Sequence, residues 1–275
     1  MARILKTAAL LLSSALSLLA ADPVKIVLVA GKPSHAPREH EFRAGTLLLE
    51  KCLKQNPGIE TVVINGGWPA DASVFEGARA VVLYMDGGTG HPMIKDDRLA
   101  TLGKLMRKGV GLVCLHYAVE VPKDRGGAEL LEWIGGFYDR PYSQNPVNDV
   151  AVTQASPNHP ISRGWKSFEG NDEWYYKIRF RPGDPRVTPI LTTMLPKDAP
   201  QRETIAWAVE RAEGGRGFGF TGAHYHKNWG MQDFRRMVVN AILWSAKVDV
   251  PRGGAKCDLA QDDLEKDLDP KTPEK

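Results

Sequence analysis

Histidines that follow predicted strands are the strongest chemical signal in this sequence. Six of the seven histidines lie in such loops: His35, His40, His91, His116, His224 and His226. Imidazole titrates near neutral pH and is the commonest metal ligand in proteins. The seventh, His159, lies in a Ser-Pro-Asn-His-Pro sequence that is typical of a turn, and we interpret it as structural. A single histidine would be better explained by a bond to a backbone carbonyl, but several at one sheet edge favour a functional site.

The pair His224 and His226 predicts a metal site together with His116. Side chains two residues apart on a strand point the same way, so both imidazoles can face one ion. We therefore expect His116, His224 and His226 to bind a divalent metal ion, zinc or manganese. Further ligands could come from His35, Asp86 and Glu173. If no metal is bound, His116 and His224 could transfer protons instead.

The loop of residues 31–41 leaves a buried strand and enters a helix. His35 lies within this loop, and we expect it to contact substrate. Asp86 follows another strand and is expected to do the same. His40 and Glu41 fall in the first helical turn, where they could equally be capping residues that stabilise the helix end.

An acidic and aromatic stretch, Asn-Asp-Glu-Trp-Tyr-Tyr, covers residues 171–176. Aromatic rings stack on pyranose faces and carboxylates hold sugar hydroxyls, so the stretch fits a carbohydrate pocket. Glu173 would be an acid/base group or substrate ligand, and Trp174, Tyr175 and Trp229 would contact the sugar. The alternative is that these aromatic residues belong to the core and the acids mark a turn.

The spacing of apolar runs predicts a parallel α/β sheet that positions these loops. Strands are expected at residues 24–30, 61–64, 80–85 and 111–115, with helices at 39–53, 97–108 and 128–134 between or after them. Residues 135–203 are interpreted as an insertion or cap, followed by a hairpin at 204–221 and a closing helix at 234–246. Ligands of such sheets bind at the carboxyl ends of the strands, where the histidines lie.

Both ends of the chain differ from the folded part. A basic start, an apolar run at residues 8–19 and Ala20-Ala21 predict a signal peptide over residues 1–20, and hence export to the periplasm or the extracellular space. After cleavage of the signal peptide, the remaining chain would not be stably inserted in a membrane. Residues 251–275 are charged and are expected to be disordered. The net charge of +3, with no basic block, argues against a nucleic-acid partner.

Several stretches in order resemble the ThuA-like (trehalose utilisation) family over residues 21–250. They are Ala-Gly-Lys-Pro-Ser-His at 30–35, Asp-Gly-Gly at 86–88, the run from Gly109 to His116, residues 171–175 and residues 215–229. The resemblance implies a flavodoxin-like, class I glutamine amidotransferase-like fold, with three layers and helices on both faces of the sheet. It also implies sugar catabolism. At the position where that fold carries its cysteine nucleophile this sequence has His116, and Cys114 lies within the strand, so glutaminase activity is not expected.

Two functions remain open at this stage. One is an enzyme of the hydrolase or lyase type on a disaccharide or keto-sugar glycoside, in which His116, His224 and Glu173 act on a small carbohydrate. The other is a non-catalytic carbohydrate-binding or sensing module. A third interpretation is that the histidines are structural and that the functional site lies in the insertion at residues 135–203. The sequence does not indicate an oligomeric state.

Overall fold

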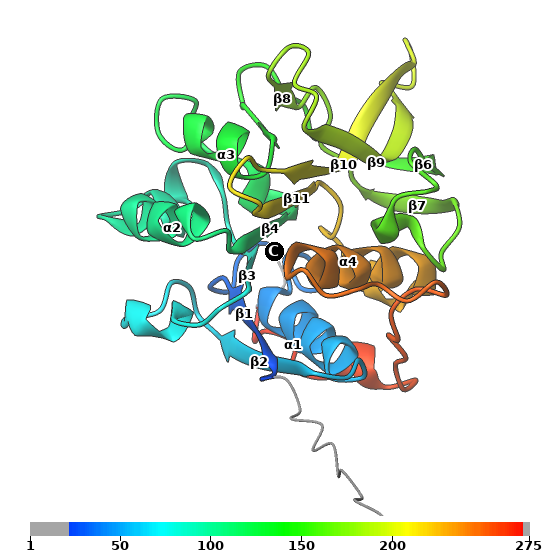
Figure 1. Cartoon of the computed structure of the whole chain (residues 1–275). Helices are drawn as coiled ribbons and strands as arrows, with labels where there is room; N and C mark the ends of the chain where they lie inside the picture. The colour runs from blue at the N-terminus through cyan, green and yellow to red at the C-terminus, as the bar shows by residue number, and fades with distance from the viewer. Residues whose placement is uncertain (1–21, 272–275) are drawn as a thin grey trace, which may run out of the picture.

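The computed structural model describes residues 22–271, so the predicted signal peptide lies outside the described residues. A nine-stranded sheet runs through the molecule in the order β2-β1-β3-β4-β11-β10-β9-β6-β7 (Figure 1). Strands β1 (Val24–Ala30), β2 (Ile59–Ile64), β3 (Ala80–Tyr84), β4 (Gly111–Leu115) and β11 (Arg216–Phe220) are parallel. This order is the flavodoxin-like one, which confirms the predicted fold class.

Helices cover the parallel strands on both faces. Helices α1 (Phe42–Leu53) and α4 (Gln232–Ser245) lie on one face, and α2 (Arg98–Arg107) and α3 (Gly127–Trp133) lie on the other (Figure 1). Successive side chains of a strand point to opposite faces, so Ile26 belongs to the core under α1 and Val27 to the core under α2. The continuous apolar strand runs follow from this double burial.

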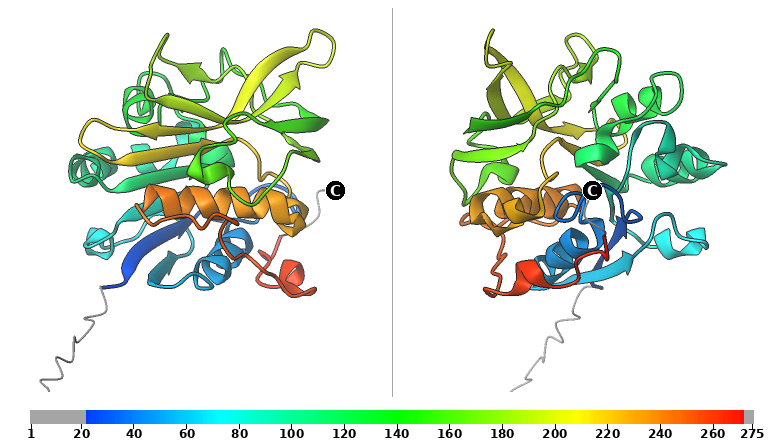
Figure 2. Two further views of the ribbon diagram at one scale, coloured as in Figure 1. Left: turned by 45° about the vertical axis from the view of Figure 1, so that its right-hand side comes forward. Right: turned by 180° about the vertical axis from the view of Figure 1, so that it is seen from behind.

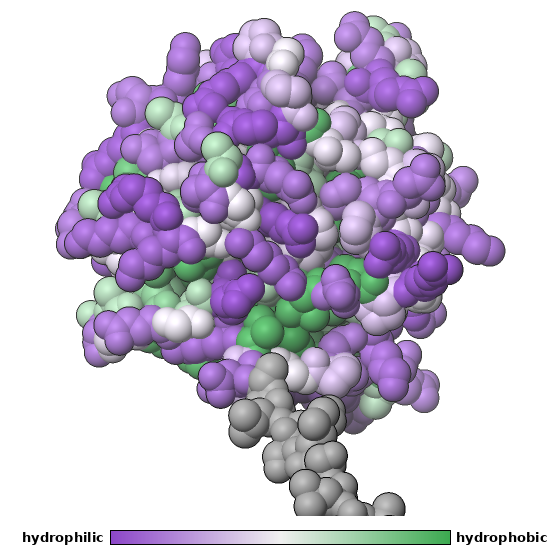
Figure 3. Space-filling view, viewed as in Figure 1, coloured by the Kyte–Doolittle hydropathy of each residue, from purple (hydrophilic) through white to green (hydrophobic). Residues whose placement is uncertain are grey.

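The inserted region continues the sheet. Strands β6 (Val147–Gln154), β7 (Phe168–Glu173), β9 (Val187–Leu195) and β10 (Gln201–Glu210) are antiparallel to their neighbours. The short strands β5 (Gly136–Phe137) and β8 (Arg179–Phe180) form a separate pair. Polar side chains cover most of the face seen in Figure 3. No helix within residues 22–271 is long and apolar enough to span a membrane.

The prediction that residues 251–275 are disordered is wrong for residues 251–271. This C-terminal segment packs beside α1 (Figure 2), and its Cys257 is fully buried. Arg235 of α4 donates to the Cys257 carbonyl at 2.7 Å. The side chain of Asn56 both donates to and accepts from the backbone of Lys256. Composition alone does not predict that this segment is ordered, because it is held by polar contacts to parts of the chain that are distant in sequence.

A buried carboxylate in this segment gives the first stability prediction. Asp263 is 4% exposed, pairs with Lys51 of α1 and accepts from the Ala260 amide at 2.6 Å. We expect Asp263→Ala to lower the free energy of unfolding by roughly 2 kcal/mol at pH 7, since hydrogen bonds to charged groups are lost. Urea unfolding, with the exposed Asp149→Ala as control, measures this difference.

The same variant has a defined pH signature. The hydrogen bond from Lys51 is the main cause that lowers the pKa of Asp263 to about 2. The pKa of an aspartate in an unfolded chain is about 4. The stabilisation is therefore present above that pH and is lost as the pH falls towards 2. The wild type and Asp263→Ala should converge in stability over this range, and a constant difference down to pH 2 would contradict the assignment.

Candidate metal centre

Three loops at the carboxyl ends of β1, β4 and β11 each bring a histidine to one point. His40 lies in the loop before α1, His116 directly follows β4, and His224 follows β11. The backbone of His40 has φ 44° and that of His116 has φ 52°, a region that residues other than glycine seldom adopt. Such conformations cost energy and persist where the surroundings hold them, often at functional sites.

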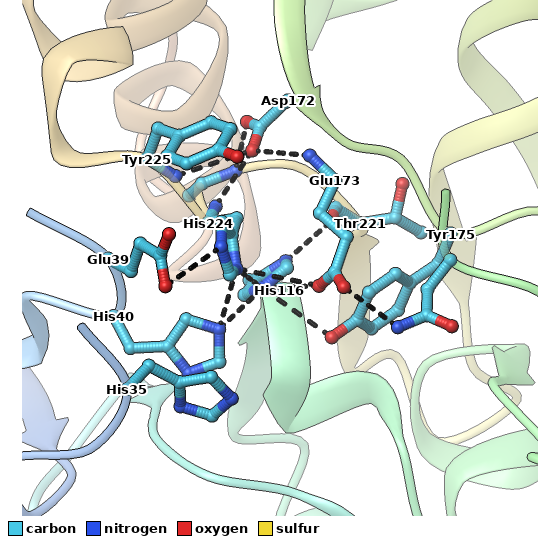
Figure 4. Close-up of polar contacts among 12 residues, drawn as sticks. His35, Glu39, His40, His116, Asp172, Glu173, Tyr175, Thr221, His224 and Tyr225 are labelled. Carbon is cyan, nitrogen blue, oxygen red and sulfur yellow. Dashed lines mark hydrogen bonds and ion pairs between the residues drawn. The ribbon is translucent and has the colours of Figure 1, made fainter. Parts of the chain in front are cut away.

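The three imidazoles direct one nitrogen each at the others (Figure 4). His40 Nε2 lies 2.9 Å from His116 Nε2 and 2.9 Å from His224 Nδ1, and the last two atoms are 3.3 Å apart. Glu173 Oε2 lies 3.5 Å from both His116 Nε2 and His224 Nδ1. These four residues thus present four ligand atoms within 4.8 Å of one another.

The outer nitrogen of each ring lies near an oxygen atom, and that of His116 is hydrogen-bonded to it. His116 Nδ1 is 2.8 Å from the Thr221 carbonyl, which can only accept, so this nitrogen carries the proton and Nε2 does not. His224 Nε2 is 3.6 Å from a carboxylate oxygen of Glu39. His40 Nδ1 is 3.5 Å from a carboxylate oxygen of Asp86 and makes no hydrogen bond to it. The bond of His116 Nδ1 to Thr221 is the kind of contact that orients metal-binding histidines, by an acceptor on the other nitrogen.

Electrostatics keep the three rings uncharged. Burial, followed by the neighbouring imidazoles, lowers the pKa of His40 and of His116 well below the usual value. Burial lowers the pKa of His224 to about 4. At pH 7 the rings are therefore neutral, and each carries one N–H. His40 Nε2 lies at hydrogen-bond distance from His116 Nε2 and His224 Nδ1, so its proton can be shared with either ring. With that proton on Nδ1 of His40 instead, the inner nitrogens would be free to bind a cation.

The donor set fits a divalent cation. Zinc binds imidazole nitrogen at about 2.0–2.1 Å in tetrahedral geometry, which places neighbouring ligand nitrogens roughly 3.3 Å apart. The observed separations of 2.9–3.3 Å are close to that value. The buried cluster of His40, His116, His224 and Glu173 could therefore hold a metal ion.

Glu173, at the end of β7, is the side chain of the cluster best suited to move protons. Its other carboxylate oxygen accepts a hydrogen bond from Asn145 at 2.8 Å. Burial raises the pKa of Glu173 to about 7, so both protonation states are accessible near neutral pH. The Tyr175 hydroxyl lies 3.5 Å from His116 Nε2, which places this predicted residue beside the cluster.

Buried charges fix the loops that carry the histidines. Asp172 is fully buried and accepts from the amides of Ala223 at 2.7 Å and His224 at 3.0 Å. In the loop before α1, the side chain of Glu41 pairs at 3.3 Å with Lys271 of the C-terminal segment. Lys271 also donates to the Glu39 carbonyl. The segment that was expected to be disordered thus supports the loop whose carboxylate orients His224.

The prediction that His226 is a metal ligand is not supported by the structure. His226 opens the 3₁₀ helix of residues 226–230, and neither of its ring nitrogens belongs to a candidate metal cluster among the described residues. The rule that side chains two apart share a face holds only on a strand. Here β11 ends at Phe220 and Ala223 has φ 88°, so the backbone has left the strand before it reaches His224, and the rule does not apply to His224 and His226.

Trp174 and Trp229 were also expected to contact substrate, and this expectation is wrong. Both side chains are 0% exposed and belong to the core under α1 and α4. Trp174 packs edge-on against Phe220, and Trp229 packs against Phe234. Neither ring presents a face on which a sugar could stack, so the alternative core interpretation is the correct one for these two residues.

Sequence reasoning missed the roles of His40 and Glu39. The sequence could not decide whether His40 is a capping residue or a functional one, because it falls at a helix start, where capping is common. The helix has no side-chain cap there, and the ring points to the centre instead. The spacing of His35 and His40 within a single loop after a strand was the one available signal.

A pocket opens beside the cluster, with a volume of about 780 Å³. His35 and Asp86, both predicted to bind substrate, line it together with Tyr117 and Glu120. His35 stacks on His40 with ring centroids 3.6 Å apart, and the ring of Tyr117 lies 5.7 Å from that of His40. The pocket is therefore separated from the cluster by one layer of side chains.

Comparisons with known proteins agree with the fold. The family model described as "ThuA: Trehalose utilisation" matches residues 26–245. A ThuA-like protein from Bacteroides uniformis superposes with TM-score 0.62 at 17% identity, covering 84% of this chain and 94% of that one. A ThuA-like protein from Parabacteroides merdae superposes with TM-score 0.63 at 16% identity, covering 88% of this chain and 99% of that one. Agd3, named as a carbohydrate deacetylase, superposes with TM-score 0.50 at 15% identity, covering 82% of this chain and 32% of that one.

A search of curated proteins found no match. The solved structures are too distant in sequence to show more than a shared fold. The family match is different in kind, because it covers most of the chain and includes all four residues of the cluster. On this basis the chain belongs to the ThuA family, described by its context in trehalose utilisation.

Proposed function

We propose that this protein is a divalent-metal enzyme of carbohydrate catabolism that acts on a disaccharide or keto-sugar glycoside. The observation that carries the proposal is the convergence of three imidazole nitrogens within 3.3 Å of one another, with a carboxylate oxygen of Glu173 3.5 Å from two of them. The family context in trehalose utilisation supports a carbohydrate substrate. The predicted signal peptide supports action in the periplasm or outside the cell.

The residues divide the chemistry between them. His40, His116 and His224 would hold the ion, and the nitrogen-rich set favours zinc, with manganese as the alternative that accepts a carboxylate ligand. A divalent ion held there would polarise a sugar carbonyl or hydroxyl. Glu173 would take a proton from the substrate and return it, since its pKa of about 7 suits both steps. His35 and Asp86 would position the sugar at the pocket wall.

Metal analysis of the purified protein tests the first half of this proposal. We expect close to one zinc or manganese ion per chain, lost in both His116→Ala and His224→Ala. His159→Ala is the matched control, because His159 packs on Trp244 far from the cluster and accepts from the Ile161 amide. A wild type that holds no metal after reconstitution with either ion would overturn the metal centre.

Turnover assays test the second half. The panel should contain trehalose, other disaccharides, their keto forms and acetylated sugars, the last because Agd3 is named as a carbohydrate deacetylase. We expect metal-dependent turnover that Glu173→Gln lowers by roughly a hundredfold or more, the usual contribution of an acid/base group. Binding of sugar and metal without turnover would replace the enzyme by a carbohydrate-binding module.

A further inference from the structure

A second carboxylate, separate from the metal cluster, lies in the pocket without a partner. Glu120 is 6% exposed, and its side chain makes no hydrogen bond or ion pair with any residue among 22–271. Its oxygens are nevertheless not among the buried polar atoms sealed from solvent. Since Glu120 lines the pocket, the unpaired carboxylate reaches the pocket interior. A buried carboxylate in this state is costly unless a ligand supplies donors.

The backbone around Glu120 fixes where this carboxylate points. The Glu120 carbonyl accepts from the Gly88 amide at 2.9 Å, and its own amide donates to the Tyr117 carbonyl at 3.0 Å. A Cβ placed on Gly88 would lie 3.1 Å from Glu120 Oε1 and 3.5 Å from the Tyr117 hydroxyl. The two polar groups therefore flank Gly88 together. The absence of a side chain at Gly88 leaves room for a ligand between them.

Tyr117 links this position to the metal cluster. Its ring packs 5.7 Å from the ring of His40, while its hydroxyl lies on the Gly88 side with Glu120. A substrate in the pocket can thus lie with one end against His35, which stacks on His40 of the cluster, and with the other end at Glu120. The nearby Asp139 is not free for a ligand, because its carboxylate pairs with Arg179 at 2.9 Å.

The chemistry of this position favours sugar hydroxyls. Burial raises the pKa of Glu120 to about 7, and the charge of Arg140 opposes the rise. The carboxyl can therefore accept from a hydroxyl when ionised and donate to one when protonated. A phenol beside it offers a further donor and acceptor. An anionic group placed directly against Glu120 would instead meet the like charge of the ionised carboxylate, while Arg140 and Lys123 line other parts of the same pocket.

Building on the proposed carbohydrate function, we propose that Glu120 and Tyr117 bind the hydroxyls of an uncharged sugar ring at the end of the pocket away from the metal. Glu120 is then a specificity-determining residue. It selects neutral pyranoses and rejects those that carry a carboxylate or a phosphate at that end. The substrate class narrows from carbohydrates in general to neutral glycosides.

Calorimetric titration of the metal-loaded protein tests the assignment. Trehalose and cellobiose serve as neutral probes, and cellobiouronic acid, which carries a carboxylate on one ring, serves as the charged probe. We expect a neutral probe to bind at least about tenfold more tightly than the charged one. Glu120→Gln should weaken neutral binding by roughly tenfold, the difference between charged and neutral hydrogen bonds, and should reduce the discrimination.

Two further variants complete the design. Asp124→Asn is the matched control, because Asp124 also lines the pocket but is exposed, and we expect it to bind like the wild type. Tyr117→Phe removes only a hydroxyl and should weaken neutral binding by a few fold, which gives an independent result if Glu120→Gln folds poorly. The metal content of all three variants should equal that of the wild type.

The outcomes separate this proposal from the metal centre. Equal affinity of Glu120→Gln and the wild type for the neutral probes would overturn it, and so would equal binding of the charged probe. Metal binding without affinity for either neutral probe would overturn the Glu120 assignment and leave the metal centre standing. A protein that binds no metal but still binds neutral sugars through Glu120 would overturn the metal centre and support the Glu120 assignment.

Discussion

His40→Ala is expected to lower the affinity for zinc by at least about a hundredfold, more than second-layer substitutions usually cost. The reason is geometric, because His40 Nε2 is 2.9 Å from the inner nitrogen of each of the other two histidines. Removing this ring leaves only two imidazoles to hold the ion, one fewer than the three protein ligands of a catalytic zinc site. Competition against a zinc-binding dye measures the affinity directly.

His226→Ala is the matched control for this measurement. His226 is 1% exposed, lies two residues from His224 in the same loop and is not part of the cluster. We expect its zinc affinity to stay within a few fold of the wild type. If His226→Ala lost the metal and His40→Ala kept it, the ligand set derived from the geometry would be wrong.

Asp172→Ala is expected to have the largest effect on stability, a loss of about 3 kcal/mol or more in the free energy of unfolding. The Asp172 carboxylate is 0% exposed and accepts from the amides of Glu173, Ala223 and His224 at 2.9, 2.7 and 3.0 Å. Alanine would leave all three amides buried without an acceptor. The loop that carries His224 would lose its anchor, so zinc affinity should fall with stability.

Urea unfolding of Asp172→Ala, Asp172→Asn and Asp149→Ala tests this expectation. Asparagine keeps one oxygen acceptor but turns an amide group towards the backbone donors, so its loss should be intermediate. Asp149 is exposed on β6, and its replacement should stay within about 0.5 kcal/mol of the wild type. Coincident unfolding curves for Asp172→Ala and the wild type would show that the carboxylate does not hold the loop.

The sequence was most informative where one physical rule decides the outcome. Four continuous apolar runs bounded by glycine or polar residues had to be parallel strands covered on both faces, and the structure confirms them. The carboxyl ends of these strands meet at one edge. The proximity of His116 and His224 followed from that fact without any side-chain detail.

The sequence was least informative where several weak forces compete. The position of His40 depends on a positive φ of 44°, which no local pattern encodes for histidine. Trp174 follows Glu173 directly, yet the side chain of Glu173 faces the cluster and that of Trp174 enters the core, beyond the end of β7. The segment after residue 251 has few apolar residues, and its order comes from contacts with α1 that are distant in sequence.

The contact between Lys271 and the loop before α1 has a consequence for the order in which the protein is made. Synthesis releases residues 31–41 early, whereas Lys271, which pairs with Glu41 and bonds to Glu39, emerges more than two hundred residues later. A growing chain therefore has the first histidines of the centre long before it has their support. We therefore expect that the loop before α1 gains this support only after synthesis has passed Lys271, and that any metal ion is bound by the completed chain.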